Sequence, residues 1–410
     1  MTDSAEKKKS RPGMTTKIVI GLIAGVLCGL FFGDYTSSIK WVGDTFVGLL
    51  QMAVLPYVAL SLITNVGGLS ASAGACLLRT SVVVICVLWL IGFATFAAMT
   101  LAFPLWEGGS FFSSRFTDEP AAPNWFDLFI PSNPFRSLAD NSIPAVVVFC
   151  IGLGIALMHH ARKQQVLKPL TVLADALADL NKLVVKMTPL GLFAIVAHTA
   201  GTVDWGQFRL IQGYLLTYGV SAIVLSFVVL PTLVAAVTPI GYWAVVKAAR
   251  EPLIAAFVIG NTFVVLPLLI DAIDKLEKEV APSAGRDGVH ADGLIPLAYP
   301  FPDIGRIVGL IFLPFAAWFF GTFIDAETYP ALLGVGFLGS FGKPVITIPL
   351  LLEIAELPSD IFNLFLASGV VAARFGDLMK TMHLMTFTIL TACSMKGMIR
   401  VHRMRLIGYS

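Results

Sequence analysis

The chain has 410 residues, of which 57% are hydrophobic and 13% are charged, and its formal net charge is +2. A soluble chain carries about 25% charged residues, so this composition excludes an ordinary globular protein and indicates a polytopic membrane protein. The small net charge gives no basic field that would attract nucleic acid. The cysteines lie in or beside apolar runs without metal-ligand spacing, which predicts lipid- or core-facing thiols and neither disulfides nor a metal site. They are Cys28, Cys76, Cys86, Cys150 and Cys393.

Six apolar runs follow the polar N-terminal tail, and each is a candidate transmembrane helix. A helix needs about 20 apolar residues to cross a bilayer. The runs are 16–33, 41–66, 80–104, 143–159, 186–202 and 208–238. The first run lacks a clean small-x-small cleavage site, so we interpret it as a retained span rather than a signal peptide. Residues 159–186 are expected to form an amphipathic connection into the fifth span.

The second half of the chain has shorter apolar pieces, separated by glycine, proline and polar residues. The divided runs are 243–275, 293–322 and 326–355, and their interruptions are residues 260–262, 299–306 and 339–344. Irregular backbone at membrane depth survives only where protein or a cavity surrounds it. Interrupted segments in corresponding positions of two halves point to the binding site of a secondary transporter. We therefore expect two re-entrant hairpins flanking a broken helix; the alternative is one ordinary span per apolar piece.

Basic residues set the expected orientation. They cluster in the N-terminal tail, in the loop after the fourth span and in the C-terminal tail, whereas residues 104–142 contain few. The positive-inside rule then places both termini in the cytoplasm and residues 104–142 outside. This pattern predicts an all-α protein of the cell (inner) membrane with eight transmembrane helices plus two hairpins, the first opening inward and the second outward. Residues 274–292 are expected to be a solvated cytoplasmic linker.

We divide the chain into four regions on this basis. They are a cytoplasmic basic tail (1–15), mostly scaffold spans (16–240), a transport core with both hairpins (241–397) and a second basic tail (398–410).

The last apolar run, residues 359–397, carries charged side chains within a segment hydrophobic enough to cross the bilayer. Arg374, Asp377 and Lys380 are spaced three apart, so they can share one helix face. A charge at bilayer depth costs about 2.5–3.5 kcal/mol on insertion scales, so such residues usually face a protein interior or a water-filled path. The stripe predicts a polar transport or binding site; a structural ion pair between helices is the alternative.

Three segments carry a family resemblance. Residues 42–56 (VGDTFVGLLQMAVLP), 130–139 (IPSNPFRSLA) and 188–194 (TPLGLFA) are similar to segments of the dicarboxylate/amino acid:cation symporters, which have the glutamate-transporter fold. The resemblance covers nearly the whole chain after residue 15. It implies a homotrimer working by alternating access, in which the hairpins gate a midplane site. The first, second, fourth and fifth spans would form the scaffold, and the remaining spans and hairpins the moving unit.

The resemblance also implies a substrate site. Its residues would be Asn261 and Thr262 at the first hairpin tip, Gly342 and Lys343 at the second, and Asp377, Lys380 and Thr381 on the last span. Asp377 matches the family aspartate that binds the substrate ammonium group. Lys380 replaces the arginine that grips a side-chain carboxylate, and since lysine binds as a point charge, we expect looser or shifted selectivity. The alternative for Lys343 is a tip residue that faces external water.

Coupling is the point at which the chain departs from the family pattern. The candidate coupling residues are Asp303, Arg306, His383 and Thr388. Asp303 matches a cation-binding aspartate, but Thr388 replaces the final one, and Leu384 and Phe301 stand where the family has amides. A hard cation wants several oxygen ligands, so at least one sodium site is expected to be lost. Lys343, Lys380 and Arg306 are expected to replace the missing ions in part.

Two of these residues have an alternative interpretation in which they take no part in coupling. Arg306 could instead form only an ion pair with Asp303, and His383 could be a packed polar residue rather than a proton-coupling group. The coupling ion, which could be Na+, a proton or neither, stays open, and no resident cofactor is expected.

The predicted function is secondary active transport of a small carboxylate or amino acid, with altered or lost sodium coupling. Two alternatives on the same fold are a non-transporting substrate sensor and an anion-conducting pore. An enzyme is the least favoured class, since no zinc-binding motif, nucleophile elbow or Walker-type loop is present in the sequence.

Overall fold

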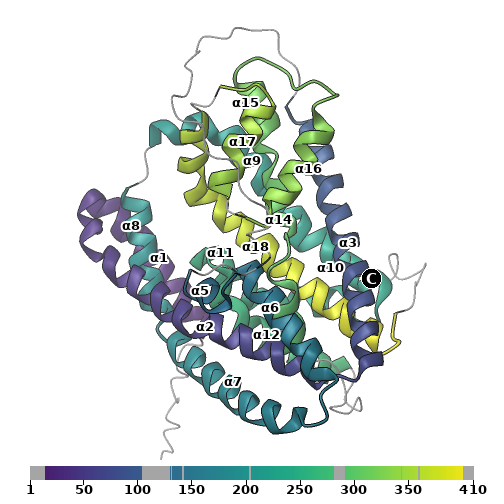
Figure 1. Cartoon of the computed structure of the whole chain (residues 1–410). Coiled ribbons are helices and arrows are strands. Elements are labelled where there is room, and N and C mark those ends of the chain that lie inside the picture. Colours follow the sequence, from purple (N-terminus) through teal and green to yellow (C-terminus); the bar gives the residue numbers. More distant parts are fainter. Residues whose placement is uncertain are drawn as a thin grey trace, which may run out of the picture. The chain divides into compact units, whose positions relative to one another are not determined.

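The computed structural model describes residues 14–103, 130, 132–140, 143–202, 205–280, 291–342, 344–358 and 361–399. All regular secondary structure in these ranges is helical (Figure 1). The chain forms two compact units: one comprises residues 1–50 and 182–203, and the other residues 51–181 and 204–410. Within the described ranges, Ala73–Thr100 and Ile211–Val237 are the two helices long and apolar enough to cross a bilayer by length and composition alone.

The smaller unit depends on a glycine-bearing face of its first helix. It contains α1 (Met14–Phe32), the 3-10 helix η1 (Gly33–Ile39), the start of α2 (Lys40–Gly68) and α8 (Thr188–Gly201). Gly21, Gly25 and Gly29 recur every four residues and share the face of α1 that contacts α8. A methyl group at Gly25 would lie 2.9 Å from the carbonyl oxygen of Phe193. Small residues allow helix backbones to approach this closely in an apolar phase.

The larger unit contains the remaining helices. They are α3 (Ala71–Thr100), α5 (Pro134–Ala139), α6 (Ile143–Met158), most of α7 (Lys163–Val185), α9 (Trp205–Val224), η2 (Leu225–Val229), α10 (Leu230–Val237), α11 (Tyr242–Ile259), α12 (Thr262–Val280), α13 (Ala291–Ala298), α14 (Ile304–Gly309), α15 (Phe312–Phe319), α16 (Tyr329–Gly339), α17 (Pro344–Ile354) and α18 (Ile361–Met395). Each of the six apolar runs predicted in the first half lies largely in a helix, and α7 occupies the expected connection.

The sixth run is one helical rod with a π turn in its middle. The amide N–H of Leu230 donates to the carbonyl of Leu225, five residues back, within η2. Pro231 follows immediately and has no N–H to donate, so the regular i→i−4 ladder is interrupted here. A π turn is one of the usual ways in which a helix accommodates such an interruption.

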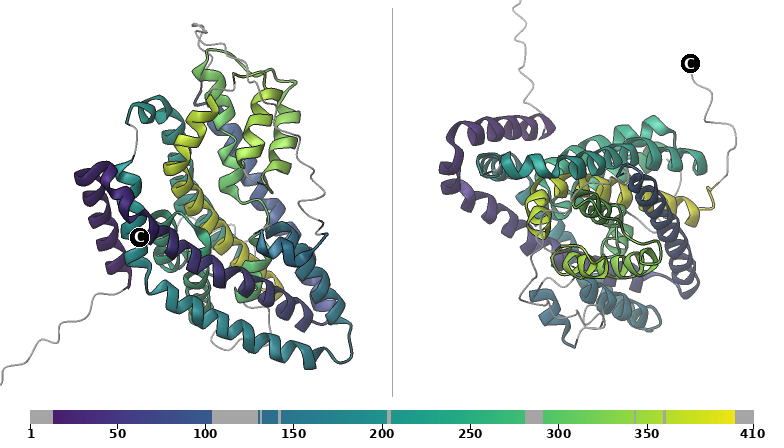
Figure 2. Two further views of the ribbon diagram at one scale, coloured as in Figure 1. Left: turned by 60° about the vertical axis from the view of Figure 1, so that its left-hand side comes forward. Right: turned by 90° about the horizontal axis from the view of Figure 1, so that it is seen from above.

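Two pairs of consecutive helices form where the sequence predicted divided segments. Helices α11 and α12 contact each other, and so do α16 and α17, which Figure 2 shows side by side. The first pair turns at Gly260, whose φ of +63° is a left-handed conformation that glycine adopts without the usual penalty. The second pair turns between Gly339 and Pro344. The breaks at both tips therefore agree with the sequence pattern.

The broken helix between these pairs consists of α13, α14 and α15. Helix α13 ends at Ala298, and Pro300 and Pro302 occupy the gap before α14, where neither proline can donate to a helical ladder. Asp303 then starts α14 as its N-cap, because its side chain accepts a hydrogen bond from the backbone N–H of Arg306 at 3.1 Å. The predicted interruption is therefore present, although Arg306 lies inside α14 rather than in the gap.

The prediction of a solvated linker over residues 274–292 is wrong at both ends. Helix α12 continues to Val280, and α13 already begins at Ala291. The reason is amphipathicity: Ile273 and Leu276 are buried in the core, while the charged residues between them and beyond cover the outer face of the helix. Residues 281–290, the middle of the predicted linker, lie outside the described residues.

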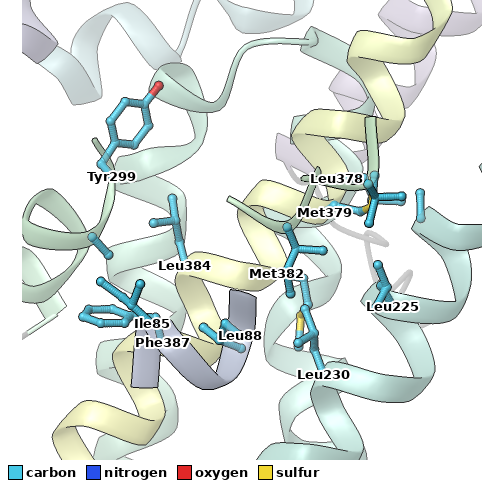
Figure 3. Packing of buried hydrophobic residues seen from close by; sticks show 14 of the residues in the cluster. Ile85, Leu88, Leu225, Leu230, Tyr299, Leu378, Met379, Met382, Leu384 and Phe387 are labelled. Carbon is cyan, nitrogen blue, oxygen red and sulfur yellow. The ribbon is translucent and has the colours of Figure 1, made fainter. Parts of the chain in front are cut away.

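Helix α18 is the centre of the larger unit. It contacts α3, α9, α11, α12, α13 and α14. Residues 378–393 of α18 are all buried. Met382, Leu384 and Phe387 pack among side chains that include Leu88 of α3 and Leu230 of α10 (Figure 3). A helix that is buried on every side holds its polar residues in fixed positions, because close-packed interiors leave side chains little room to move.

Candidate functional site

A cavity of about 400 Å³ lies in the larger unit, among α9, α14, α16, α17 and α18. Its walls are mainly apolar, with aromatic rings and glycines, and four charged side chains line it. These are Asp303 and Arg306 from α14 and its cap, and Asp377 and Lys380 from α18. A concave, mostly apolar space with a few convergent polar groups is the usual form of a small-molecule site.

Asp303 is the point where the charged groups meet. Its carboxylate is 3% exposed and caps α14 through the amide of Arg306. One oxygen, Oδ2, lies 3.6 Å from Nε of Arg306 and 3.9 Å from Nζ of Lys380. A carboxylate this deeply buried is stable in its charged form only when it is paired and hydrogen-bonded, and here both conditions are met.

Lys380 is only 7% exposed, and two groups stabilise its ammonium. One is the carboxylate of Asp303. The other is the ring of Tyr299, whose centroid lies 3.7 Å from Nζ. A cation over the face of an aromatic ring is attracted by the ring quadrupole, by about 2 kcal/mol or more when the pair is desolvated. The lysine therefore keeps a charge at the cavity wall without needing water around it.

Asp377 connects α18 to the tip of the first hairpin. Its Oδ1 accepts hydrogen bonds from the hydroxyl of Thr262 and, at 3.2 Å, from the backbone N–H of the same residue. One turn earlier on α18, Nη1 of Arg374 donates to the carbonyl of Val258 at 2.5 Å. A methyl group at Gly260 would lie 2.9 Å from the same Nη1, so the glycine also leaves space for this arginine. Two residues of the charged stripe, Arg374 and Asp377, therefore bond to the first hairpin near its tip.

Arg306 connects α14 to the tip of the second hairpin. Its Nη1 donates to the carbonyl of Ser340 at 2.6 Å and to the carbonyl of Gly342 at 3.2 Å. Its Nε meanwhile faces Asp303. One guanidinium therefore links a carboxylate at the start of α14 with two backbone carbonyls that follow α16. The expected alternative, an ion pair with Asp303, is present, but it accounts for only part of what Arg306 contacts.

Positive and negative side chains are equal in number along the described part of the cavity wall. Two carboxylates, Asp303 and Asp377, stand opposite two cationic side chains, Arg306 and Lys380. The wall formed by these residues is electrically neutral, and each carboxylate has a donor or cation from another element. An anion entering the space would meet fixed positive groups already in position.

Several predicted site residues converge and others do not. Asp303, Arg306, Asp377 and Lys380 line the cavity, while Thr262 and Gly342 bond to residues that do. Asn261 is half-buried beside Thr262, and Lys343 lies outside the described residues. The others, Thr381, His383 and Thr388, are buried in α18 and do not line the cavity.

The three buried polar residues of α18 differ in their bonding. The hydroxyl of Thr388 donates to the carbonyl of Leu384 at 2.8 Å, as serine and threonine often do within helices. Thr381 Oγ1 and both ring nitrogens of His383 have no hydrogen-bond partner among the described residues. The roles predicted for them, substrate binding for Thr381 and coupling for His383 and Thr388, stay predictions.

Sequence reasoning missed three polar contributors. Ser340 accepts the bond from Arg306, Tyr299 stacks under Lys380, and Tyr218 donates its hydroxyl to the carbonyl of Gly305 at 2.9 Å. Tyr299 and Ser340 had a local signal, since they lie in the predicted interruptions 299–306 and 339–344. Tyr218 lies in a plain apolar run, where nothing distinguishes it from a core residue.

Comparison with known proteins identifies one matching family and several similar transport proteins. The sequence profile of the sodium:dicarboxylate symporter family matches residues 14–397. The chain is similar to the C4-dicarboxylate transport protein of Rhodospirillum rubrum, with 27% identity over 277 residues that cover 63% of this chain and 61% of that one. It is also similar to the proton/sodium-glutamate symport protein of Bacillus subtilis, with 25% identity over 325 residues, or 73% and 72% of the two chains. The chain thus spans 61% and 72% of the lengths of these two relatives.

Proposed function

This chain belongs to the sodium:dicarboxylate symporter family, and from that membership we propose that it carries a small dicarboxylate across the membrane by alternating access. The observation that carries the proposal is Lys380, a nearly buried ammonium on the wall of a cavity large enough for a small molecule. Relatives are named for C4-dicarboxylates and for glutamate. All of these substrates bear two carboxylates, so a fixed cation is the shared requirement.

The proposed roles follow from the charges. Lys380 attracts one substrate carboxylate as a point charge, without the bidentate geometry that an arginine would impose. Thr262 holds Asp377 in place, and Asn261, Gly342 and Lys343 complete the site around the two hairpin tips. Thr381 follows Lys380 on α18 and would act from behind the cavity wall. An unbranched C4-dicarboxylate fits this arrangement better than an amino acid, because Asp377 already accepts two hydrogen bonds from Thr262 and is less available to an ammonium group.

We further propose that sodium coupling is altered or lost. Asp303 is already neutralised by Arg306 and Lys380 at 3.6 and 3.9 Å. Thr388 offers only a neutral hydroxyl, which donates its proton to the carbonyl of Leu384, and the side chain of Leu384 offers no oxygen. A hard cation that needs several oxygen ligands is poorly served by this set. A proton, through His383, or no ion at all would then accompany the substrate.

The assembly and its orientation are proposed from the family and the sequence. We place the protein in the cell (inner) membrane as a homotrimer, with both termini cytoplasmic, eight spans, and α11–α12 and α16–α17 as the two re-entrant hairpins. Regions 16–240 and 241–397 would act mainly as scaffold and transport core.

Uptake into proteoliposomes tests this function. Labelled C4-dicarboxylates, aspartate and glutamate would be offered under a sodium gradient, a proton gradient, or no gradient with unlabelled substrate inside. We expect dicarboxylate uptake that does not depend on sodium. Accumulation driven by sodium alone would refute the coupling proposal, and binding without uptake or exchange would refute transport.

A matched pair of lysine variants links the uptake to the site. Lys380→Met should abolish uptake, whereas Lys275→Met should leave it unchanged, because Lys275 is exposed and paired with Asp271 within α12. Equal activity in the two variants would remove Lys380 from the mechanism.

A further inference from the structure

We propose that Arg306 is a built-in latch: its guanidinium holds the tip of the second hairpin closed over the cavity, so that closure needs no bound metal cation. This inference rests on the proposed transport function only in treating the tip as a gate. Its physical content is a bond between a side chain of α14 and the backbone of the α16–α17 turn. Arg306 would then be a positioning residue.

The bond joins the helix α14 to the turn that follows α16. Arg306 belongs to α14, which is fixed to the rest of the larger unit: the hydroxyl of Tyr218 on α9 donates to the carbonyl of Gly305. A methyl group at Gly305 would also lie 2.9 Å from the carbonyl oxygen of Gly376 on α18, so α14 and α18 touch through their backbones. The guanidinium therefore extends from a held helix to the tip of a hairpin.

The acceptors are groups that require a cation or a donor. The carbonyls of Ser340 and Gly342 follow the last residue of α16, where a helix leaves its final carbonyls without intrahelical partners. The C-terminal end of a helix also carries partial negative charge, which favours a cation. Backbone carbonyls grouped in this way are typical ligands for hard metal ions. Here the guanidinium already occupies that position.

Asp303 keeps the latch in a defined orientation. Its carboxylate lies beside Nε of Arg306, so that Nη1 is directed toward the tip. A guanidinium has a planar arrangement of five donors, which lets it contact a carboxylate on one side and carbonyls on the other. A lysine at this place could supply the charge but could not make both sets of contacts at once.

The first hairpin shows the same device. Arg374 on α18 donates to the carbonyl of Val258, in the last turn of α11, directly before the tip glycine. In both hairpins an arginine from a neighbouring helix bonds the carbonyl end of the first arm. The repetition in two unrelated sequence contexts supports a common role, namely that fixed charges close the tips.

Hydrogen–deuterium exchange on the full chain in lipid nanodiscs tests the latch directly. The amides of Ser340, Phe341 and Gly342 are bonded within the turn, so their exchange reports its opening. In wild-type protein we expect the same slow exchange in sodium chloride and in choline chloride. If sodium slows exchange at these amides by more than about threefold, a metal ion contributes to closure and the proposal fails.

Variants at Arg306 provide the second arm of the experiment. Arg306→Gln should speed exchange at the tip by about tenfold or more, as expected for losing hydrogen bonds to a charged group, and Arg306→Lys should fall between this variant and wild type. Arg136→Gln is the control, because Arg136 of α5 pairs with Asp140, the residue after that helix, and its side chain is 80% exposed. Exchange in Arg306→Gln at the wild-type rate would overturn the proposal.

The measurement is made without substrate and is therefore independent of the transport assay. Hydrogen exchange as expected, without dicarboxylate uptake, would support the latch and refute the proposed function. Dicarboxylate uptake, with hydrogen exchange at the tip that does not change in Arg306→Gln, would support the function and refute the latch.

Discussion

The pairing of Lys380 with Asp303 gives a quantitative prediction. At a separation of 3.9 Å, an effective dielectric constant of about 20 gives an attraction of about 4 kcal/mol. Both side chains are nearly buried, so solvent screens this pair little. Arg306 also faces Asp303, but its side chain is 36% exposed, and it would compensate only in part for a missing lysine. We therefore expect Lys380→Met to lower the free energy of unfolding by about 2–4 kcal/mol.

A double-mutant cycle separates this charge term from packing. Methionine keeps most of the apolar stem of Lys380, and Asp303→Asn keeps a side chain that caps helices well. Each single variant leaves buried charge with less compensation, whereas the double variant removes both members of the pair. The loss in free energy of unfolding of the double variant should therefore be smaller than the sum of the two single losses, by at least about 1.5 kcal/mol.

Reversible unfolding in mixed micelles, followed by the fluorescence of the seven tryptophans, would measure these free energies. Single effects that add to within about 0.5 kcal/mol would show that the two groups do not interact, and would refute the reasoning. A stabilised Lys380→Met variant would refute it as well, since it would mean that the desolvation of the lysine outweighs its attraction to Asp303 and Tyr299.

Three further variants test contacts around the hairpins by the same unfolding measurement. Gly260→Ala should lower stability by more than Gly33→Ala: both positions have positive φ, but only at Gly260 would the new methyl group meet a neighbouring side chain, and equal losses would contradict this. Thr262→Val should cost about 1.5–3 kcal/mol, because the valine keeps the shape but removes the hydroxyl bonded to a carboxylate, and a neutral result would show that bond to be dispensable. Trp89→Phe should cost about 1 kcal/mol beyond the loss of packing, because the indole N–H donates at 2.7 Å to the carbonyl of Pro302. This extra cost should be absent when Trp89→Phe is made in a variant that already lacks the proline break.

Helix breaks were the part of the fold that the sequence predicted best. Glycine at 260 and the prolines of residues 300–302 act through local backbone geometry, which does not depend on the rest of the protein. The linker was predicted poorly for the opposite reason. The charges after Asp274 indicated solvent, but the burial of Leu276 depends on neighbours that are distant in sequence.

The candidate site was predictable in its charged residues and unpredictable in their partners. A charge within an apolar span is conspicuous in a sequence, so Asp377 and Lys380 were found from the charged stripe, whereas Asp303 was found from the family resemblance. Which groups they face depends on how separate helices cross. Arg374 was recognised as part of the stripe, yet its bond to Val258 follows from the position of the first hairpin, which no local pattern specifies.

The balance of charges in the described part of the cavity lining has an electrical consequence for transport. An empty cavity with balanced charges crosses a membrane potential without doing work, whereas the same cavity loaded with a dianion carries two negative charges. Moving both toward a compartment held 100 mV negative costs about 4.6 kcal/mol, twice the 2.3 kcal/mol for one elementary charge. Inward accumulation of a dianion would then require positive charge to travel with it, but trading one dianion for another is electroneutral. The balanced charges of Asp303, Arg306, Asp377 and Lys380 therefore suit a swap of internal for external dicarboxylate better than concentrative import.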